Sequence, residues 1–324
     1  KAADDPLVLA IKITLYRVSK DSPIIEALMR AAENGKEVMT LVELKARFDE
    51  DNNIQWAKQL EQAGIHVVYG ILGFKTHTKI ALVVRKEKGR LRNYFHIGTG
   101  NYNSNTSRYY TDIGFLSTDP DISSDLIELF NYLSGFSKQK AYQKLLVSPT
   151  SLRKKFIFLI NREIENIEEG KKGEIIAKMN SLVDPEIIQL LYLASQKGVK
   201  IHLIIRGICC LYPQRENLSE NIKVTSIIGH FLEHSRIFWF YNNNNPEVFI
   251  GSADWMRRNL DRRIEAVTPI EDLKLKSQLY DLLQTYIDDN YYSWIMNKDG
   301  IYEKKERDSN SNRSQIDLIK RLKK

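Results

Sequence analysis

Two short stretches decide the fold of this chain, because they are versions of one another. The first is Phe74-Lys75-Thr76-His77-Thr78-Lys79, and the second is Phe231-Leu232-Glu233-His234-Ser235-Arg236. In both cases an apolar run precedes the stretch and another follows the histidine, before a turn and a return to a glycine-led segment. Internal repetition of this kind indicates two copies of one structural unit.

The repeat extends in both directions from the two histidines. Helical segments, which Asp21 and Asp184 would cap with a proline in the first turn, come before the strand-like runs 38–44 and 200–205. The later matching elements are the runs 65–69 and 222–226, the runs 80–84 and 237–240, and the glycine-led segments 98–101 and 251–254. The order strand, helix, strand, helix, strand, hairpin therefore occurs twice. It predicts an α/β fold with a mixed sheet flanked by helices in each half.

The length of 324 residues suits two domains. We place them at 1–148 and 149–300, with an amphipathic helix over 152–167 leading into the second domain. Residues 301–324 are predicted to be a polar C-terminal tail, loosely ordered or weakly helical. Because the chain begins with Lys1 rather than Met, we expect it to be a piece of a longer protein.

Composition narrows the class of protein. No apolar run approaches the twenty residues that a bilayer requires, and the adjacent Cys209 and Cys210 cannot easily form a bridge. We therefore expect a cytoplasmic protein, with membrane association left open. The net charge of +7 is compatible with nucleic acid, an acidic membrane surface or a polyanionic small substrate, and its sign alone does not choose among them.

His77 and Lys79 are the sharpest chemical signal. Two residues apart on a strand, they would point to the same face, where a neutral imidazole can attack phosphorus while the ammonium stabilises the non-bridging oxygens. Pairing of the two halves would bring His77 and His234 face to face, one as nucleophile and the other as general acid. The alternative is two core histidines satisfied by backbone carbonyls. The cation two residues after each histidine argues against it, because such a cation is hard to bury.

These motifs resemble two known families. The duplicated histidine-x-cation pattern resembles the phospholipase D superfamily, although no Asp follows Lys79 at the usual short spacing and Arg236 stands where that family has its second lysine. The closer resemblance is to bacterial polyphosphate kinases of the histidine-dependent type. It is carried by residues 11–17, 41–50, 75–79, 96–103, 177–185, 206–211 and 251–256. The resemblance implies the two C-terminal catalytic domains of that family, a tandem of phospholipase D-like α/β domains without the family's N-terminal and head domains.

The polyphosphate kinase resemblance also implies an activity. This is the reversible, Mg²⁺-dependent transfer of the terminal phosphate of ATP through a phosphohistidine to inorganic polyphosphate, with release of ADP. By residue, it implies His77 as the phosphohistidine, His96 as a further histidine linked to the same chemistry, Tyr110, Arg206 and His234 at ATP, and Arg17 and Arg47 at the metal. As partners it implies ATP, ADP and polyphosphate, and a homo-oligomer formed through the full-length protein. It implies neither nucleic acid nor obligate membrane insertion.

The residue chemistry supports much of this independently. Polyphosphate is a chain of negative charges, and Arg17, Arg47, Arg206 and Arg236 fall at or near predicted strand ends, where guanidinium groups can grip phosphate oxygens. A guanidinium has no lone pair to give Mg²⁺, so Arg17 and Arg47 are expected to hold phosphate oxygens around the ion. Carboxylates that could assist the metal are those of Glu43, Asp49 and Glu233.

Three weaker features of the sequence each allow two interpretations. The segment 98–101 could cradle phosphate with its amides or form a tight turn. Tyr109 and Tyr110 could stack on adenine or pack on the sheet. The arginines at 257, 258, 262 and 263 could contact phosphate or a partner, or could lie on a solvated loop.

Two rival functions remain open from the sequence. One is a phosphodiesterase of phospholipase D type, which the missing Asp disfavours. The other is a non-catalytic binder of polyanions or nucleic acid, which predicts steeply salt-dependent binding and leaves the duplicated histidines unexplained.

Overall fold

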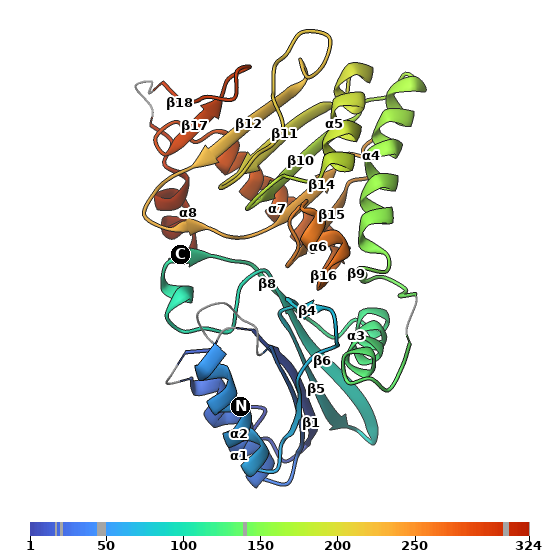
Figure 1. Ribbon diagram of the computed structural model, residues 1–324, viewed down its shortest axis with the longest axis vertical. Helices are drawn as coiled ribbons and strands as arrows, with labels where there is room; N and C mark the ends of the chain where they lie inside the picture. The colour runs from blue at the N-terminus through green and yellow to red at the C-terminus, as the bar shows by residue number, and fades with distance from the viewer. Residues whose placement is uncertain (17, 20–21, 44–49, 139–140, 307–310, 324) are drawn as a thin grey trace.

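The computed structural model describes residues 1–16, 18–19, 22–43, 50–138, 141–306 and 311–323. It consists of two halves stacked along the long axis of the molecule, each with its own sheet (Figure 1). Among the described residues, no helix is long and apolar enough to cross a membrane.

The first half is built on a six-stranded mixed sheet with the order β3-β2-β1-β5-β6-β8. Strands β1, β2 and β3 run parallel, whereas β5, β6 and β8 are added antiparallel. Helices α1 and α2 pack on one face and α3 on the other (Figure 1). The bounds are β1 Val8–Leu15, α1 Pro23–Glu33, β2 Glu37–Val42, α2 Glu50–Gln62, β3 His66–Val68, β5 Ile80–Glu87, β6 Arg90–Gly98, β8 Gly114–Ser117 and α3 Pro120–Leu133.

The second half is built on a larger mixed sheet with the order β18-β17-β12-β11-β10-β14-β15-β16-β4, and β9 also pairs with β16. Helices α4 and α5 cover one face and α7 the other (Figure 1). The bounds are β9 Leu146–Ser148, α4 Leu152–Glu168, β10 Glu174–Met179, α5 Pro185–Lys197, β11 Lys200–Ile205, β12 Ile222–Ile227, β14 Ile237–Phe240, β15 Glu247–Gly251, α6 Arg257–Asp261, β16 Arg263–Ile270, α7 Leu273–Ile287, β17 Ser293–Met296 and β18 Tyr302–Lys304.

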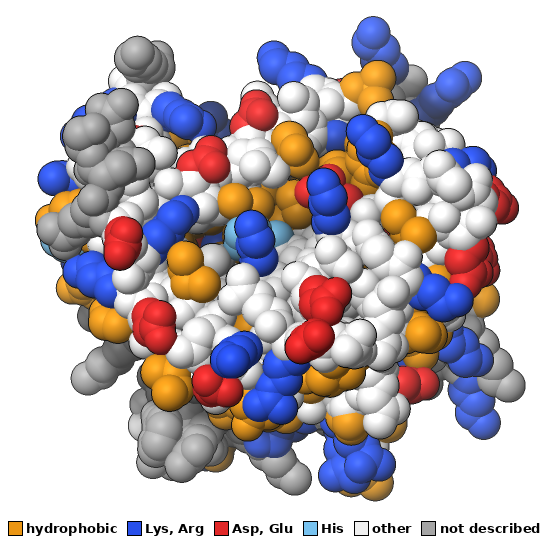
Figure 2. All heavy atoms as spheres, turned by 90° about the horizontal axis from the view of Figure 1, so that it is seen from above, with side chains coloured by type: hydrophobic (Ala, Val, Ile, Leu, Met, Phe, Trp, Pro, Cys, Tyr) orange, Lys and Arg blue, Asp and Glu red, His pale blue; other side chains and the backbone are white. Residues whose placement is uncertain are grey.

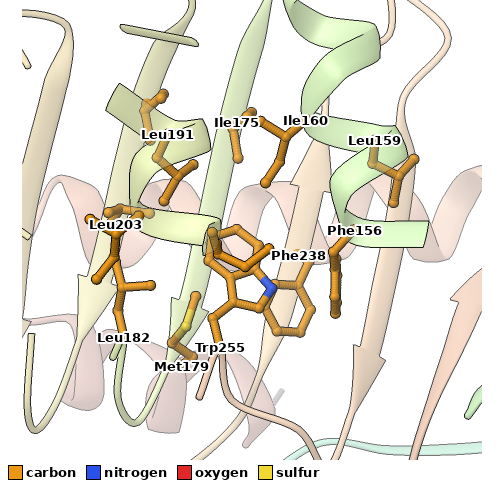
Figure 3. Close-up of a cluster of buried hydrophobic side chains, with 14 of the residues drawn as sticks. Phe156, Leu159, Ile160, Ile175, Met179, Leu182, Leu191, Leu203, Phe238 and Trp255 are labelled. Carbon is orange, nitrogen blue, oxygen red and sulfur yellow. The ribbon is translucent and has the colours of Figure 1, made fainter. Parts of the chain in front are cut away.

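The core beneath α4 shows why the sequence forms this layer. Phe156, Leu159 and Ile160 recur at helical spacing on α4 and point at the sheet, as Figure 3 shows. There Phe156 meets Phe238 of β14 and the ring of Trp255, and these last two rings stack on one another with centroids 5.3 Å apart. The amphipathic helix predicted over 152–167 is therefore confirmed.

The internal repeat is confirmed by the strand order. The run β2-β1-β5-β6 of the first sheet corresponds to β11-β10-β14-β15 of the second, with the same parallel and antiparallel relations. The predicted second helix of the second half is wrong, because no helix lies between β11 and β12 in the fully described stretch 206–221. Pro213 and the left-handed backbone of Gln214 and Asn217, with φ of 55° and 57°, oppose a helix there.

Two further expectations need correction. Ser22 is the N-cap of α1, whereas Asp21 lies outside the described residues; Asp184 caps α5 as predicted, accepting a hydrogen bond from the amide of Ile187. In the segment 301–324, the loosely ordered alternative is wrong for the described part, whereas the helical alternative is confirmed for Ser314–Leu322. The described part of this segment forms β18, which pairs with β17, and helix α8 (Ser314–Leu322), whose Gln315 is buried.

Short strands join the two halves next to each histidine. Strand β4 (Lys75–Thr76), directly before His77, pairs with β16 of the second half. Strand β13 (Leu232–Glu233), directly before His234, pairs with β7 (Tyr110–Thr111) of the first half, which follows the short 3₁₀ helix η1 (Thr106–Arg108). Each histidine is thereby placed at the junction between the halves.

Candidate active site

His77 lies in an extended link between β4 and β5, and not within a strand as the sequence predicted. Its ring meets the ring of Tyr16 edge-on, with centroids 4.9 Å apart, and the Nζ of Lys79 lies 5.3 Å from the centroid of the same Tyr16 ring. His77 and Lys79 therefore share one side of the link, as the two-residue spacing predicted.

A buried carboxylate from the other half holds the His77 ring. Nδ1 of His77 lies 2.9 and 3.0 Å from the two oxygens of Glu265, which is fully buried on β16. The hydroxyl of Ser252 and the amide of Asn259 also donate to these oxygens. With those two donors engaged, the carboxylate acts as an acceptor, so Nδ1 carries the proton and Nε2 keeps its lone pair.

His234 is held by the mirror arrangement. Its Nδ1 lies 2.8 Å from an oxygen of Asp112, a residue of the first half, and the hydroxyl of Thr99 donates to the same oxygen at 2.6 Å. Each half thus supplies one histidine and one carboxylate that fixes the histidine of the other half, and a hydroxyl from its glycine-led segment donates to that carboxylate. We call this arrangement of His77, Glu265, His234 and Asp112 the crossed pairs.

Sequence reasoning missed both carboxylates of the crossed pairs, although a signal was present. Thr99 and Asp112 are thirteen residues apart, and so are Ser252 and Glu265. A hydroxyl residue in each glycine-led segment followed at the same distance by an acid is a second property of the repeat. It identifies Asp112 and Glu265 once the two halves are aligned.

Burial and neighbouring cations keep both imidazoles neutral. The pKa of His77 falls well below its ordinary value, first because the ring is buried and then because Lys79, Arg263 and Arg236 are close. Burial, followed by Arg236, lowers the pKa of His234 to about 4. Arg236 lowers the pKa of both rings, although the two histidines belong to different halves. The two histidines therefore lie near the same guanidinium.

The two carboxylates differ in their electrostatics. Burial raises the pKa of Glu265, against the opposing charge of Lys79. Burial would also raise the pKa of Asp112, but the hydrogen bond from His234 and the hydroxyl of Thr99 hold it below its ordinary value.

Both cations of the motif are buried, contrary to expectation, with Lys79 2% exposed and Arg236 3% exposed. The ammonium of Lys79 donates to the carbonyl of His77, and burial lowers its pKa well below the ordinary value although Glu265 opposes the shift. The histidines nevertheless bind carboxylates rather than backbone carbonyls. The geometry therefore differs from that of two satisfied core histidines.

Arg236 has other partners than the phosphate oxygens suggested by the sequence. Its Nε lies 3.2 Å from Asp254, and its Nη1 donates to the carbonyls of Thr99 and His234 at 3.1 and 2.8 Å. This guanidinium therefore braces the two halves against one another and contributes its charge to the site.

Arg206, Tyr110 and His234 are brought together, as the sequence suggested. The Tyr110 ring lies against the His234 ring, with centroids 4.9 Å apart. Nε and Nη2 of Arg206 donate to the side-chain oxygen of Asn180, at 2.9 and 2.6 Å, and its Nη1 has no acceptor among the described residues. Burial and then the charge of Arg236 lower the pKa of Arg206.

His96 lies beside this group but has its own partner. On β6, its Nδ1 lies 2.7 Å from the hydroxyl of Tyr102, and it shares the lining of a depression of about 270 Å³ with Tyr110 and Asp112. A Cβ on Gly114 would come within 2.4 Å of the His96 ring, so this glycine is needed to accommodate it.

Two of the amides proposed as a phosphate cradle are already used. Gly98 N–H donates to the carbonyl of Lys79 at 2.8 Å, and Thr99 N–H to that of Ile113 at 2.9 Å. These hydrogen bonds favour the structural interpretation of the 98–101 segment.

Of the four clustered arginines, Arg263 is the one that reaches the site. It opens β16 and is close enough to lower the pKa of His77, whereas Arg257, Arg258 and Arg262 are exposed. On the face drawn in Figure 2, Lys and Arg side chains are interspersed with Asp and Glu rather than gathered into one continuous patch.

The described residues do not form a protein-held metal site. Arg17, Arg47 and Asp49 lie outside the described residues. Glu43 accepts a hydrogen bond from the amide of Thr76, and Glu233 forms a buried ion pair with Lys178 at 3.0 Å. Within the described part of the chain, no three His, Cys, Asp or Glu residues are grouped so that they could hold a metal ion.

Comparison with known proteins identifies the family. Residues 1–139 match the family description of polyphosphate kinase C-terminal domain 1, and residues 145–315 match that of C-terminal domain 2. A polyphosphate kinase from Parasynechococcus marenigrum is 65% identical over 322 residues, which are 99% of this chain and 45% of that protein. The chain thus spans less than half the length of the curated relatives it matches.

Comparison with solved structures supports the same family. The crystal structure of polyphosphate kinase from Porphyromonas gingivalis matches with a TM-score of 0.92 and 40% identity, over 99% of this chain and 49% of that one. A phosphatidylserine synthase from Haemophilus influenzae, at 11% identity and a TM-score of 0.63, covers 99% of this chain and 90% of its own, and shares the fold alone. The predicted α/β fold, with a mixed sheet flanked by helices in each half, is confirmed. The chain belongs to the polyphosphate kinase family, of which it carries C-terminal domains 1 and 2.

Proposed function

We propose that this chain is the catalytic half of a polyphosphate kinase, which passes the terminal phosphate of ATP through a phosphohistidine on His77 to inorganic polyphosphate. The observation that carries the proposal is the contact between Nδ1 of His77 and the buried carboxylate of Glu265. It fixes the proton on Nδ1 and leaves Nε2 as a neutral nucleophile among cations.

In the first step, Nε2 of His77 attacks the γ-phosphorus in line with the bridging oxygen, and the bond from that oxygen to phosphorus breaks to release ADP. The ring becomes positively charged as it accepts the phosphoryl group. Glu265, 2.9 Å from Nδ1, balances that charge. Lys79 and Arg263 add positive potential where charge gathers on the non-bridging oxygens.

In the second step, a terminal oxygen of polyphosphate attacks the phosphohistidine, and His77 leaves as a neutral ring. The step is reversible because a phosphoanhydride is exchanged for another. His234 faces the site from the other half. In the first step it protonates the bridging oxygen that leaves with ADP, or it steadies the phosphoryl group during transfer. Bound phosphates raise its pKa from about 4, so that it can take up the required proton.

The same reasoning suggests which residues bind the nucleotide and how the metal would be held. Tyr110 and Arg206, which gather beside His234, bind ATP, and the guanidinium can offer Nη1 to a phosphate. When Mg²⁺ accompanies ATP, the phosphates would hold the ion and it would offset their negative charge, while arginine side chains would bind the same phosphate oxygens.

The test uses the full-length protein with γ-labelled ATP and Mg²⁺. The expected result is an acid-labile, base-stable label on the wild type and none on His77→Ala. A labelled His77→Ala protein would refute the assignment of the nucleophile. Hydrolysis of a phosphodiester without ATP would instead favour a phosphodiesterase of the kind that shares this fold.

A further inference from the structure

The residue before His234 is a buried carboxylate with three donors from three elements. Glu233 is 3% exposed. Its oxygens accept from Lys178 of β10 at 3.0 Å, from the hydroxyl of Thr111 of β7 at 2.8 Å, and from the amide of Gln315 of α8 at 2.8 Å. The backbone beside His234 is therefore fixed by side chains from three other elements.

Gln315 makes the most extensive of these contacts. It is 2% exposed, and its Nε2 donates to the carbonyl of Phe231 at 2.9 Å as well as to Glu233. Its Oε1 accepts from the amide of Phe231 at 3.0 Å. One side-chain amide thus satisfies both backbone groups of Phe231, as a neighbouring strand would, and also the carboxylate of Glu233.

The start of α8 is anchored so that Gln315 has a fixed position. The amide of Ser314 donates to Oδ2 of Asp289 at 2.7 Å, while Oδ1 of Asp289 accepts from the amides of residues 291–293. In Figure 1, α8 lies at the level of the junction between the halves. A helix from the far end of the chain is therefore fixed against the segment that carries His234.

The contacts continue to His234 itself. Its amide donates to the carbonyl of Thr111 at 3.2 Å, and the hydroxyl of the next residue, Ser235, accepts from Lys178 at 2.8 Å. Both sequence neighbours of His234 are thus held from one side. The imidazole projects to the other side, toward Asp112.

We propose that Gln315 is a positioning residue for His234, acting through Phe231 and Glu233. The proposal rests on the role of His234 in phosphoryl transfer. Gln315 is assigned a positioning role and no substrate contact, because it is 2% exposed and both polar atoms of its side chain already have protein partners.

The experiment is a double-mutant cycle in the full-length protein, read as the single-turnover rate of label transfer from γ-labelled ATP to the enzyme. Gln315→Met keeps the side-chain length and removes all three hydrogen bonds. We expect a rate about 10-fold to 100-fold below wild type, since a displacement of about 1 Å in a reacting group costs on the order of 10²-fold, with a KM for ATP within about twofold of the wild-type value.

Non-additivity distinguishes positioning from general damage. In the His234→Ala background, Gln315→Met should change the rate by less than about twofold, because the group that it positions is gone. The matched control is Gln278→Met, an exposed glutamine of α7 that lines the same cavity of about 740 Å³ as Gln315. It should leave the rate unchanged.

Gly229 provides a second perturbation that keeps the amide. A Cβ at Gly229 would lie 2.4 Å from Oε1 of Gln315, so Gly229→Ala must push the side chain aside. It should lower the rate in the same direction, and the same cycle can be run with it if Gln315→Met does not fold. Rate losses that multiply with that of His234→Ala would overturn the positioning role. A His234→Ala enzyme with wild-type rate would instead overturn the proposed role of His234.

Discussion

Replacing Glu265 with Gln tests the central contact of the site with a nearly isosteric change. In the native site the carboxylate accepts from Nδ1 of His77, from Ser252 and from Asn259. An amide keeps one acceptor oxygen and turns the other position into a donor. If that oxygen stays with His77, the new NH₂ faces a group that was itself donating.

The expected effect of Glu265→Gln has two parts, a loss of folding stability and a loss of catalytic rate. Folding loses about one buried hydrogen bond, roughly 1–3 kcal/mol. In the proposed mechanism, catalysis loses the negative charge 2.9 Å from Nδ1, which would select the tautomer and balance the charged phosphohistidine. The equivalent Asp-to-Asn change in a Ser-His-Asp triad lowers kcat by about 10⁴. Because Lys79 and Arg263 remain and disfavour a charged ring even more without Glu265, we expect a fall on the order of 10²–10⁴ here.

The assay is rapid-quench formation of base-stable label on the full-length protein, together with its thermal unfolding midpoint. The matched control is Glu163→Gln. Glu163 is a fully buried glutamate of α4 that accepts from the backbone amides of Asn242 and Glu174, so the substitution perturbs a buried carboxylate outside the crossed pairs. It should lower the unfolding midpoint and leave the labelling rate within about twofold.

A Glu265→Gln enzyme that labels at more than about a third of the wild-type rate would refute this reasoning, because an effect of that size leaves no catalytic role for the carboxylate. A loss equal to that of Glu163→Gln in both measurements would have the same consequence. It would mean that Glu265 serves the fold alone.

Three further outcomes are expected. His77→Gln should abolish labelling as completely as His77→Ala, because an amide cannot hold a phosphoryl group, and residual base-stable label on either variant would contradict this. Arg206→Lys should lower kcat/KM for ATP by about 10²-fold although the charge is kept. A single ammonium cannot both donate to Asn180 and bind phosphate in the manner of a guanidinium. Steady-state kinetics that show a loss below about threefold would place Arg206 away from the nucleotide. The pKa of His234 lies at about 4 in the folded protein, against an ordinary value of 6.5 that the unfolded chain retains, so the unfolded chain binds more protons between these values. The free energy of unfolding should therefore fall as the pH drops from 6.5 to 4, with a contribution from His234 of roughly 3 kcal/mol. Urea titrations of His234→Gln should show a shallower pH dependence than those of the wild type.

The sequence revealed those parts of the fold that repeat as local patterns. Strands and helices around His77 and His234 were visible because each is a contiguous run with its own periodicity, and the aligned histidines set the register between the halves. Helix formation at 206–221 was predicted only by analogy with the first half. There, local backbone preferences at Pro213, Gln214 and Asn217 overrule the repeat.

The site was less accessible to sequence reasoning because its essential contacts cross between the halves. Glu265 meets His77 across 188 residues of chain, and Asp112 meets His234 across 122. The matched spacing from Thr99 and Ser252 can single out the two acids, but it does not say which histidine each acid meets. The same limit applies to Gln315, since only the docked helix shows that its amide reaches Phe231 and Glu233.

The crossed pairs also have a consequence for synthesis on the ribosome. The chain emerges from its N-terminal end, so His77 is complete long before the residue that orients it has been translated. Until Glu265 has been made and β16 has docked beside β4, the imidazole has no carboxylate to select its tautomer. On the proposed function, a nascent or prematurely terminated first half would therefore carry His77 without the carboxylate that orients it, and phosphoryl transfer from ATP would require both halves.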